Sequence, residues 1–184
     1  EWVDLSHELY KDNKYDLRES IEDFSILLED IKSFPNEEWT AITLYQKENV
    51  SARALVTVSK LNPAIAKVGF IECIEDPMAF KMLWNEVEVA AKELGAKKIK
   101  GPVNFHFFVS YRWKLWGDSK PFYGEPQQKP YYIEFFKLVG MQQLKTWDTF
   151  RIRFFRSKQQ YGEIRESKKP QHRLHIRGVD MNNF

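Results

Sequence analysis

The sequence is short of the features that mark secreted, membrane-spanning and metal-binding proteins. Its 184 residues include a single cysteine, Cys73, which excludes an internal disulfide and favours a reducing compartment, so we expect a cytoplasmic protein. No secretory signal opens the chain, and no apolar run approaches the ~20 residues that a transmembrane helix needs. The four histidines show no spacing typical of a metal site. We therefore expect neither a membrane span nor a bound metal.

Aromatic residues, by contrast, are abundant. Fourteen Phe, eight Tyr and six Trp in a chain that is 43% hydrophobic argue against disorder and favour one folded core. We place that domain at residues 1–155, followed at 156–184 by a polar, basic linker and the start of a truncated second part. The first residue is Glu1 rather than Met, and an apolar pattern begins at Leu174 before the sequence stops. We expect the chain to be part of a longer protein.

The net charge of +2 is unevenly distributed along the chain. From residue 151 onward, Lys and Arg outnumber Asp and Glu nine to three, and the preceding part is slightly acidic. A basic tail can bind nucleic acid or anionic phosphate, but it can also be a solvated linker. The tail contains no recognisable nucleic-acid-binding motif, so we do not expect a nucleic-acid partner.

The segment from Lys67 to Phe105 has the pattern of a strand, a helix and a second strand. Residues 68–74 alternate with the period of two that is typical of a strand, so Val68, Phe70, Glu72 and Ile74 should share one face. Asp76 and Pro77 are a helix cap and a first helical residue, and Gly95 ends the helix. A second strand follows from Lys98 and is interrupted by Gly101-Pro102. We expect a right-handed parallel crossover, with a ligand at the rim formed by residues 72–76 and 102–106.

The flanking segments predict a hairpin and further helices. Trp39–Gln46 and Ala52–Ser59 are rich in β-forming residues, and we expect an antiparallel hairpin with a loop of about five residues. Helices are predicted within residues 1–13, at 16–34 behind a capping box, and at Tyr131–Val139 between Pro130 and Gly140. Residues 106–128 form an aromatic loop, and Leu144–Phe155 has the pattern of a strand.

Three stretches resemble the GNAT (Gcn5-related N-acetyltransferase) superfamily, in particular a group of poorly characterised bacterial members. They are VGFIECIEDP at 68–77, GPVNF at 101–105 and KPYYIEFFKLVGM at 129–141. The resemblance implies an α/β (α+β) fold with a mixed sheet, in which an antiparallel N-terminal hairpin precedes a parallel β-α-β core with splayed central strands. It also implies an acyltransferase that moves an acyl group from an acyl thioester to a small-molecule amine.

The resemblance also assigns roles to individual residues. Glu72 would be the general base, and Tyr131 or Tyr132 would supply a proton. His106, which follows the strand-end Asn104, is a second candidate base because of its residue type and position rather than the resemblance. Free backbone groups of the splayed strands would hold the pantetheine arm of the donor, at Ile71, Cys73, Ile74 and Asn104. Each residue also has a simpler interpretation. Glu72 could be a solvent-facing carboxylate at the rim of the sheet, and His106 a hydrogen-bonded loop histidine. Asn104 could simply form a turn, and the two tyrosines could serve only in aromatic packing. A nucleophilic role for Cys73 is not favoured, because no histidine is near it in the sequence.

Two departures from the superfamily bear on the donor. The loop after the first central strand, residues 74–80, has no glycine. It does contain two acids and Pro77, which lacks an N–H, so it is poorly suited to bind a diphosphate. Phe136 stands where many members place a proton-donating tyrosine. The donor could therefore be acyl-CoA that is held in a different way from that of the superfamily, or it could be an acyl carrier protein. The alternative is a non-catalytic GNAT-like binding or scaffolding domain.

Overall fold

The computed structural model describes residues 2, 4–12, 29, 34–105, 110–117 and 125–150. The chain divides into two units, Glu1–Gln143 and Leu144–Phe184, and every helix and strand described below belongs to the first. The predicted helix at 16–34, His106 and the basic tail from residue 151 lie outside the described residues, apart from single positions of that helix. The domain boundary at residue 155 stays a prediction. Residues 144–150 form no strand, so the strand predicted to begin at Leu144 is wrong over this part.

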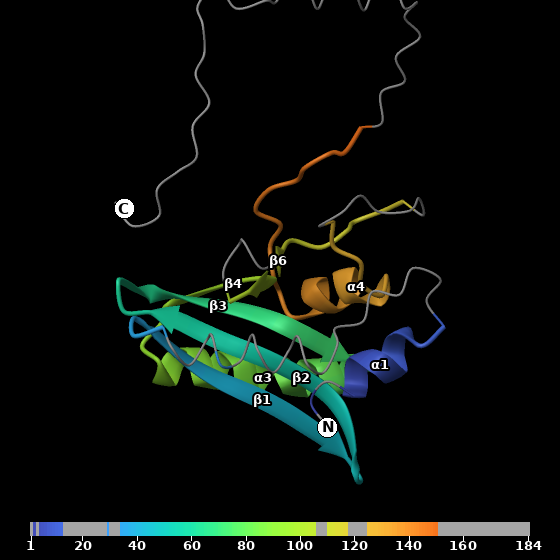
Figure 1. Cartoon of the computed structure of the whole chain (residues 1–184), viewed down its shortest axis with the longest axis horizontal. Coiled ribbons are helices and arrows are strands. Elements are labelled where there is room, and N and C mark those ends of the chain that lie inside the picture. Colours follow the sequence, from blue (N-terminus) through green and yellow to red (C-terminus); the bar gives the residue numbers. More distant parts are fainter. Residues whose placement is uncertain are drawn as a thin grey trace, which may run out of the picture. The chain divides into compact units, whose positions relative to one another are not determined.

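A four-stranded mixed sheet forms the centre of the first unit, in the order β1-β2-β3-β4 (Figure 1). β1 (Glu37–Gln46), β2 (Asn49–Ser59) and β3 (Asn62–Cys73) are antiparallel, and β4 (Lys98–Lys100) joins β3 in parallel. β5 (Val103–Asn104) and β6 (Ser110–Tyr111) make a separate two-stranded antiparallel sheet. The fold class predicted from the sequence, with an antiparallel hairpin ahead of a parallel β-α-β core, is confirmed.

The hairpin is tighter than the sequence suggested. Its turn consists of Lys47 and Glu48, with Lys47 at a φ of 58°. The prediction of a five-residue loop is wrong, because β2 already begins at Asn49. Gln46 pairs with Asn49, and Tyr45 pairs with Val50. A β-bulge beside Tyr45 absorbs the resulting shift in register.

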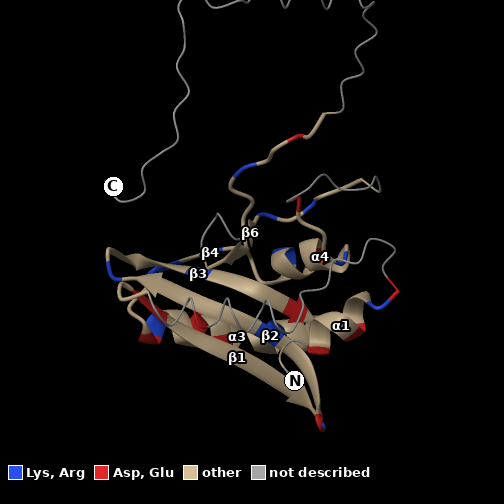
Figure 2. Ribbon diagram, in the orientation of Figure 1, with Lys and Arg blue, Asp and Glu red and all other residues tan. Residues whose placement is uncertain are grey.

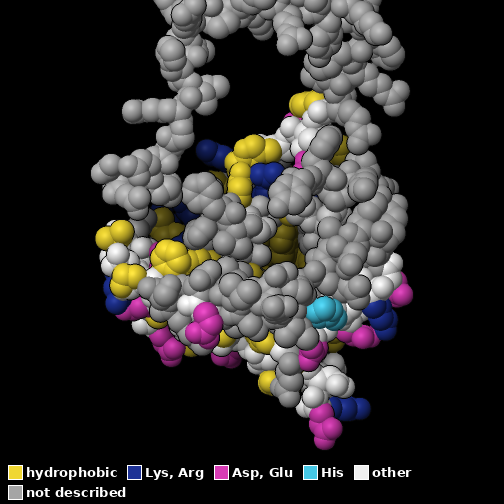
Figure 3. Space-filling model, in the orientation of Figure 1, with side chains coloured by type: hydrophobic (Ala, Val, Ile, Leu, Met, Phe, Trp, Pro, Cys, Tyr) yellow, Lys and Arg dark blue, Asp and Glu magenta, His cyan; other side chains and the backbone are white. Residues whose placement is uncertain are grey.

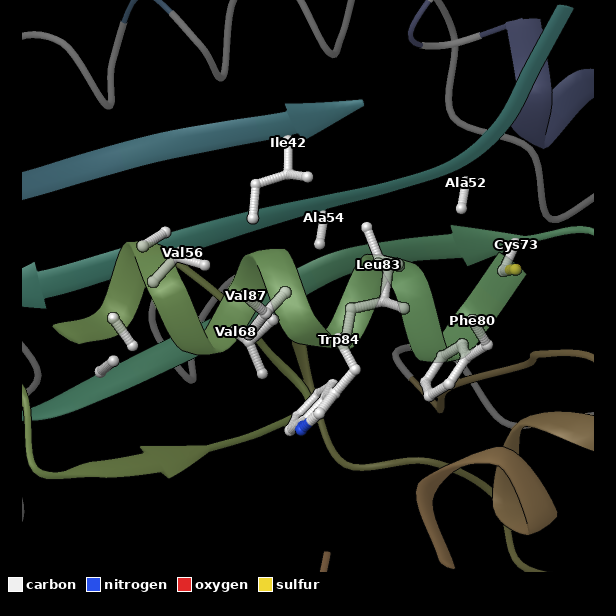
Figure 4. Packing of buried hydrophobic residues seen from close by; sticks show 14 of the residues in the cluster. Ile42, Ala52, Ala54, Val56, Val68, Cys73, Phe80, Leu83, Trp84 and Val87 are labelled. Carbon is white, nitrogen blue, oxygen red and sulfur yellow. The ribbon is translucent and has the colours of Figure 1, made fainter. Parts of the chain in front are cut away.

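Helix α3 (Pro77–Glu93) covers one face of the sheet, as Figure 4 shows. The Asp76 side chain caps it by accepting a hydrogen bond from the Met78 N–H at 2.8 Å, and Gly95 follows it at a φ of 82°. Both ends therefore lie where the sequence places them. The core between helix and sheet contains Ala54, Val56, Ala66, Val68, Phe80, Leu83, Trp84 and Val87, all buried.

Two shorter helices lie at the end of the sheet where β3 finishes (Figure 1). α1 (Asp4–Tyr10) is the predicted N-terminal helix. α4 (Tyr131–Leu138) follows Pro130 and ends before Gly140, whose φ of 78° terminates it, as predicted to within one residue. None of the helices in the described part of the chain is long and apolar enough to span a membrane.

A β-bulge interrupts the alternation of β3. Arg53 pairs with Glu72 and Leu55 with Gly69, so β3 uses one residue more than β2 over this interval. The extra residue lies beside Phe70, which has a φ of 50°.

The bulge reverses which residues share a face. Val68 and Ile71 both belong to the core beneath α3, whereas Phe70 packs with Leu55 and Phe105 in a second cluster. The prediction that Val68, Phe70 and Glu72 face the same side is therefore wrong. Its physical reason is the inserted residue, since the alternation resumes one step out of phase.

Charged side chains are interspersed over the described elements. Lys and Arg, and Asp and Glu, are scattered over the strands and helices (Figure 2), and both signs occur on the face shown in Figure 3. The basic tail itself lies outside the described residues.

Candidate active site

The carboxylate of Glu72 meets two tyrosine hydroxyls at the end of β3. The Tyr132 hydroxyl, from α4, donates to Glu72 Oε2 at 2.7 Å. The Tyr10 hydroxyl, from α1, donates to the same oxygen at 3.3 Å. The two predicted candidates Glu72 and Tyr132 are thus brought together, although 60 residues separate them. Hydrogen bonds from phenols to a carboxylate are charge-assisted and therefore stronger than neutral ones.

The backbone of Cys73 is bound by Tyr132 and by the adjacent residue of α4, Tyr131. Its N–H donates to the Tyr132 hydroxyl at 2.7 Å. Its carbonyl accepts from the Tyr131 hydroxyl at 2.7 Å and lies 3.1 Å from the Tyr132 hydroxyl, whose single proton is shared with the nearer Glu72. We predicted free backbone groups at this position for a pantetheine arm. That expectation is wrong for Cys73, because side chains of α4 satisfy both groups.

The Cys73 thiol lies in the core at the end of α3, close to Phe80 in Figure 4. The residue is fully buried. Burial, with smaller contributions from Asp76 and Glu72, raises the pKa of the thiol to about 12. At neutral pH it is a thiol rather than the nucleophilic thiolate. The geometry therefore agrees with the view that Cys73 is not a nucleophile.

The two central strands part, as the resemblance implies, but earlier along β3 than expected. β3 and β4 pair only from Ile65–Lys67 to Lys98–Lys100, after which the cis Gly101-Pro102 bond leads into β5, which pairs with β6 instead. β5 still passes very close to β3, because Gly69 has no side chain. A Cβ on Gly69 would lie 2.2 Å from the carbonyl oxygen of Val103.

Asn104 bridges this gap between the strands. Its Oδ1 accepts a hydrogen bond from the Phe70 N–H at 2.8 Å, at the β-bulge. The bulge left that N–H outside the strand ladder, and the side chain of β5 replaces the missing partner. This oxygen is therefore engaged by the strand rather than by a ligand, which supports a structural role for Asn104.

Burial raises the pKa of all three tyrosines around Glu72. For Tyr10 and Tyr132 desolvation is the largest cause, followed by the negative charge of Glu72. For Tyr131 desolvation again dominates, opposed by a hydrogen bond from Tyr132 and reinforced by Glu72. All three phenols consequently keep their protons at neutral pH and act as hydrogen-bond donors. Tyr132 is fully buried and Tyr131 is only partly buried, so Tyr131 is the more accessible hydroxyl.

The remaining candidates fall into different surroundings. The side chain of Ile71 is buried in the core against α3. The Ile74 N–H donates to the carbonyl of Ser51 at 2.9 Å, so it is engaged within the chain. Phe136 packs edge-on against Trp113, with 4.6 Å between ring centroids, and also contacts Trp84. His106 lies outside the described residues, so its role as a base stays a prediction.

The N-terminus of α3 is capped from within the chain. Asp76 occupies the Met78 N–H, and Pro77 has no N–H to offer. A diphosphate at a helix N-terminus requires free N–H groups and is favoured by the helix dipole. Two of the first donors are therefore missing here, and the residues present do not fit the diphosphate of coenzyme A. Within the described residues, no group of His, Cys, Asp and Glu could hold a metal ion.

Tyr10 is the member of this cluster that sequence reasoning missed. It lies 62 residues before Glu72 in the chain, in a short helix whose sequence contains no motif. The only available signal was amphipathicity, since Leu5 and Tyr10 are both buried. That pattern predicts a packed helix but gives no indication of its partner.

Comparison with known proteins gives only distant similarities. No protein-family model matches the chain, and no curated protein matches it. Among solved structures, a candidate acetyltransferase from Agrobacterium tumefaciens is 13% identical with a TM-score of 0.48, over 82% of this chain and 93% of that one. A transcriptional regulator from Bacillus halodurans is 13% identical with a TM-score of 0.47, over 83% and 93%. A candidate acetyltransferase from Pyrococcus furiosus is 17% identical with a TM-score of 0.44, over 82% and 93%.

Proposed function

We propose that this domain transfers an acyl group from an acyl thioester to an amine, with Glu72 as the general base. The observation that carries the proposal is the Glu72 carboxylate held by Tyr132 and Tyr10 near the end of β3, beyond the last residue at which β3 pairs with β4. A partly buried carboxylate at a strand end, fixed by two donors, is a positioned proton acceptor. The sequence resemblance to GNAT acyltransferases supports the same reaction class.

In the proposed reaction the amine nitrogen attacks the thioester carbonyl. The new C–N bond forms as the C–S bond breaks, Glu72 takes the proton of the amine, and the sulfur leaves as a thiolate. Positioning of the two reactants supplies much of the rate enhancement. Tyr131 is our choice as proton donor to the thiolate, because its hydroxyl is the more accessible of the two predicted ones. The Tyr132 hydroxyl is enclosed between Cys73 and Glu72.

The donor is an acyl thioester that does not depend on the N-terminus of α3 for its diphosphate. An acyl carrier protein meets this condition, as does a long-chain acyl-CoA bound mainly through its acyl chain. Exposed acids at this helix end would also repel free phosphates, since Glu75 is exposed and Asp76 is partly so. We place the acyl chain against aromatic side chains of the segment that follows β5, which includes Trp113 and Trp116.

The test is turnover of acetyl-CoA, octanoyl-CoA, palmitoyl-CoA and an octanoyl acyl carrier protein with a panel of primary amines. Release of thiol is measured by a disulfide reagent, to which the buried Cys73 contributes little background. Glu72→Gln should lower turnover by roughly 10²–10⁴-fold, the usual range for a lost general base. Glu86→Gln, on the exposed side of α3, is the matched control and should leave turnover unchanged.

His106→Ala tests the other predicted base. If this variant loses activity while Glu72→Gln keeps it, His106 is the base and our assignment is wrong. If both variants keep full activity, neither residue is the base. Absence of turnover with every donor and acceptor would contradict acyl transfer itself.

A second function, a non-catalytic binding domain, is favoured by one specific observation. Both backbone groups of Cys73 are bound within the chain, so the strand end presents fewer partners for a pantetheine arm than an open acyl-thioester site would. This alternative predicts that acyl-CoA or an amine raises the melting temperature without any release of thiol. Thermal unfolding in the presence of each compound separates the two functions.

A further inference from the structure

Arg53 is the only charged residue among the side chains that are fully buried in the described part of the chain. It lies on β2, directly opposite Glu72 of β3 in the antiparallel register. Its neighbours Ala52 and Ala54 belong to the core beneath α3, so Arg53 points to the other face of the sheet. Glu72 points to that face too, because directly opposed residues of an antiparallel pair share one side.

The guanidinium of Arg53 binds the N-terminal segment at two places. Nη1 donates to the carbonyl of Trp2 at 2.7 Å, and Nη2 donates to the hydroxyl of Ser6. The guanidinium also lies over the Trp2 ring, 4.5 Å from its centroid. Burying a charge is costly unless such partners compensate for the lost water, so this arrangement depends on the N-terminal segment being in place.

Ser6 and Tyr10 are one helical turn apart on α1, and both are buried. Residues four apart lie on the same face of a helix. The contact that fixes Ser6 on Arg53 therefore also fixes Tyr10 over the sheet, where its hydroxyl reaches Glu72. Figure 2 shows a basic segment of β2 beside an acidic segment of β3, at the end of the sheet nearest α1.

We infer that Arg53 is a positioning residue for the site: it fastens α1 to the sheet and thereby holds the Tyr10 hydroxyl on Glu72. Lysine cannot replace it, because an ammonium has neither the planar fork that spans two acceptors nor the flat face that stacks on Trp2. The inference deepens the proposed function and rests on it for the kinetic part of the test. A second part of the test does not depend on any activity.

The kinetic part is a double-mutant cycle between Arg53 and Tyr10. Tyr10→Phe should lower kcat about tenfold, because it removes one donor to the base, and Arg53→Lys should lower kcat by a similar factor. If Arg53 acts through Tyr10, the double variant is also about tenfold slower than the wild type. A hundredfold loss, with the two effects multiplying, would overturn the inference. If Arg53→Lys only destabilised the domain, it would lower the melting temperature by the same amount in the wild type and in Tyr10→Phe. Its effect on kcat would then still multiply with the effect of Tyr10→Phe.

The second part uses tyrosine labelled with ¹³C at Cζ, whose resonance reports hydrogen bonding of the hydroxyl. The Tyr10 resonance, assigned with Tyr10→Phe, should move in Arg53→Lys and in the milder Ser6→Ala. Ser6→Ala keeps the buried charge and provides the test if Arg53→Lys does not fold. Ser59→Ala, on β2 near the opposite end of the strand, is the control and should leave it in place.

The two parts distinguish the possible failures. An unchanged Tyr10 resonance in the folded Arg53 and Ser6 variants would overturn the inference, whatever the kinetics show. If the resonance moves but the wild type turns over no thioester, the positioning of Tyr10 stands as a structural fact and the proposed function fails.

Discussion

Tyr131 and Tyr132 offer a sharp test, because the same change at adjacent residues should have unequal effects. Tyr132→Phe removes a charge-assisted donor from Glu72, worth about 1.5–3 kcal/mol, and leaves the buried Cys73 N–H without its acceptor, worth about 1–3 kcal/mol. We expect a loss near the lower end of the sum, ~3 kcal/mol, because Tyr10 still donates to Glu72. Tyr131→Phe removes one neutral hydrogen bond, and the Cys73 carbonyl keeps Tyr132 at 3.1 Å. We expect about 1 kcal/mol there.

The assay is urea unfolding, followed by tryptophan fluorescence and circular dichroism. Equal m-values are required for all variants, so that the change in midpoint measures stability. Tyr45→Phe is the control, since the residue is 55% exposed and the change should stay within about 0.5 kcal/mol. Losses that are equal for the two variants, or larger for Tyr131→Phe, would refute the hydrogen-bond network around Cys73.

Four further predictions follow from separate features. Gly69→Ala should destabilise the domain by about 3 kcal/mol, because the new Cβ would clash with the backbone of β5. Gly95→Ala should cost only about 1 kcal/mol, because Gly95 has a φ of 82° but open space around it. Equal losses of stability in urea unfolding would contradict the clash at Gly69. Cys73 should resist alkylation in the folded domain and react once urea unfolds it, as mass spectrometry would show; rapid labelling of the native protein would refute its burial. Folding raises the pKa of Tyr10, Tyr131 and Tyr132, so above pH 10 the unfolded chain loses these protons while the folded domain keeps them. The free energy of unfolding should therefore fall by up to about 1.4 kcal/mol per pH unit for each of these tyrosines. Equal stability at pH 8 and pH 11 would contradict this. Coenzyme A should bind more weakly than acyl-CoA, with affinity rising by ~0.8 kcal/mol per buried methylene; equal affinities in calorimetry would exclude an acyl-binding surface.

The helices were predictable because their signals are local. The cap at Asp76, the first-turn Pro77 and the terminal Gly95 are each within a residue or two of the boundary that they set. The same applies to α4 between Pro130 and Gly140. The parting of the two central strands was expected from the resemblance, and Gly101-Pro102 marks the interruption of the second strand.

The site was only partly predictable, because its contacts join distant segments. Glu72 and the tyrosines of α4 came from the resemblance, and the structure places Tyr132 in contact with Glu72 and Tyr131 on the neighbouring Cys73 carbonyl. Tyr10 and Arg53 carry no local signal: one is a buried aromatic in a short helix, and the other is a basic residue in a strand of apolar neighbours. A buried arginine can be expected only once its partners are known, since these are what offset its desolvation.

The bulge at Phe70 explains why Glu72 belongs to this site at all. Without the extra residue, the alternation from Val68 would place Glu72 on the face beneath α3, in the apolar core. An ionised carboxylate there would cost several kcal/mol and would have no hydroxyl partner. With the bulge, Glu72 turns to the face that carries α1 and shares its oxygen between Tyr10 and Tyr132. The bulge leaves the Phe70 N–H outside the strand ladder. Asn104 Oδ1 accepts a hydrogen bond from this N–H, next to Gly69, where β5 comes very close to β3. One inserted residue therefore turns the carboxylate toward its partners, and β5 compensates for the break that it makes in the sheet.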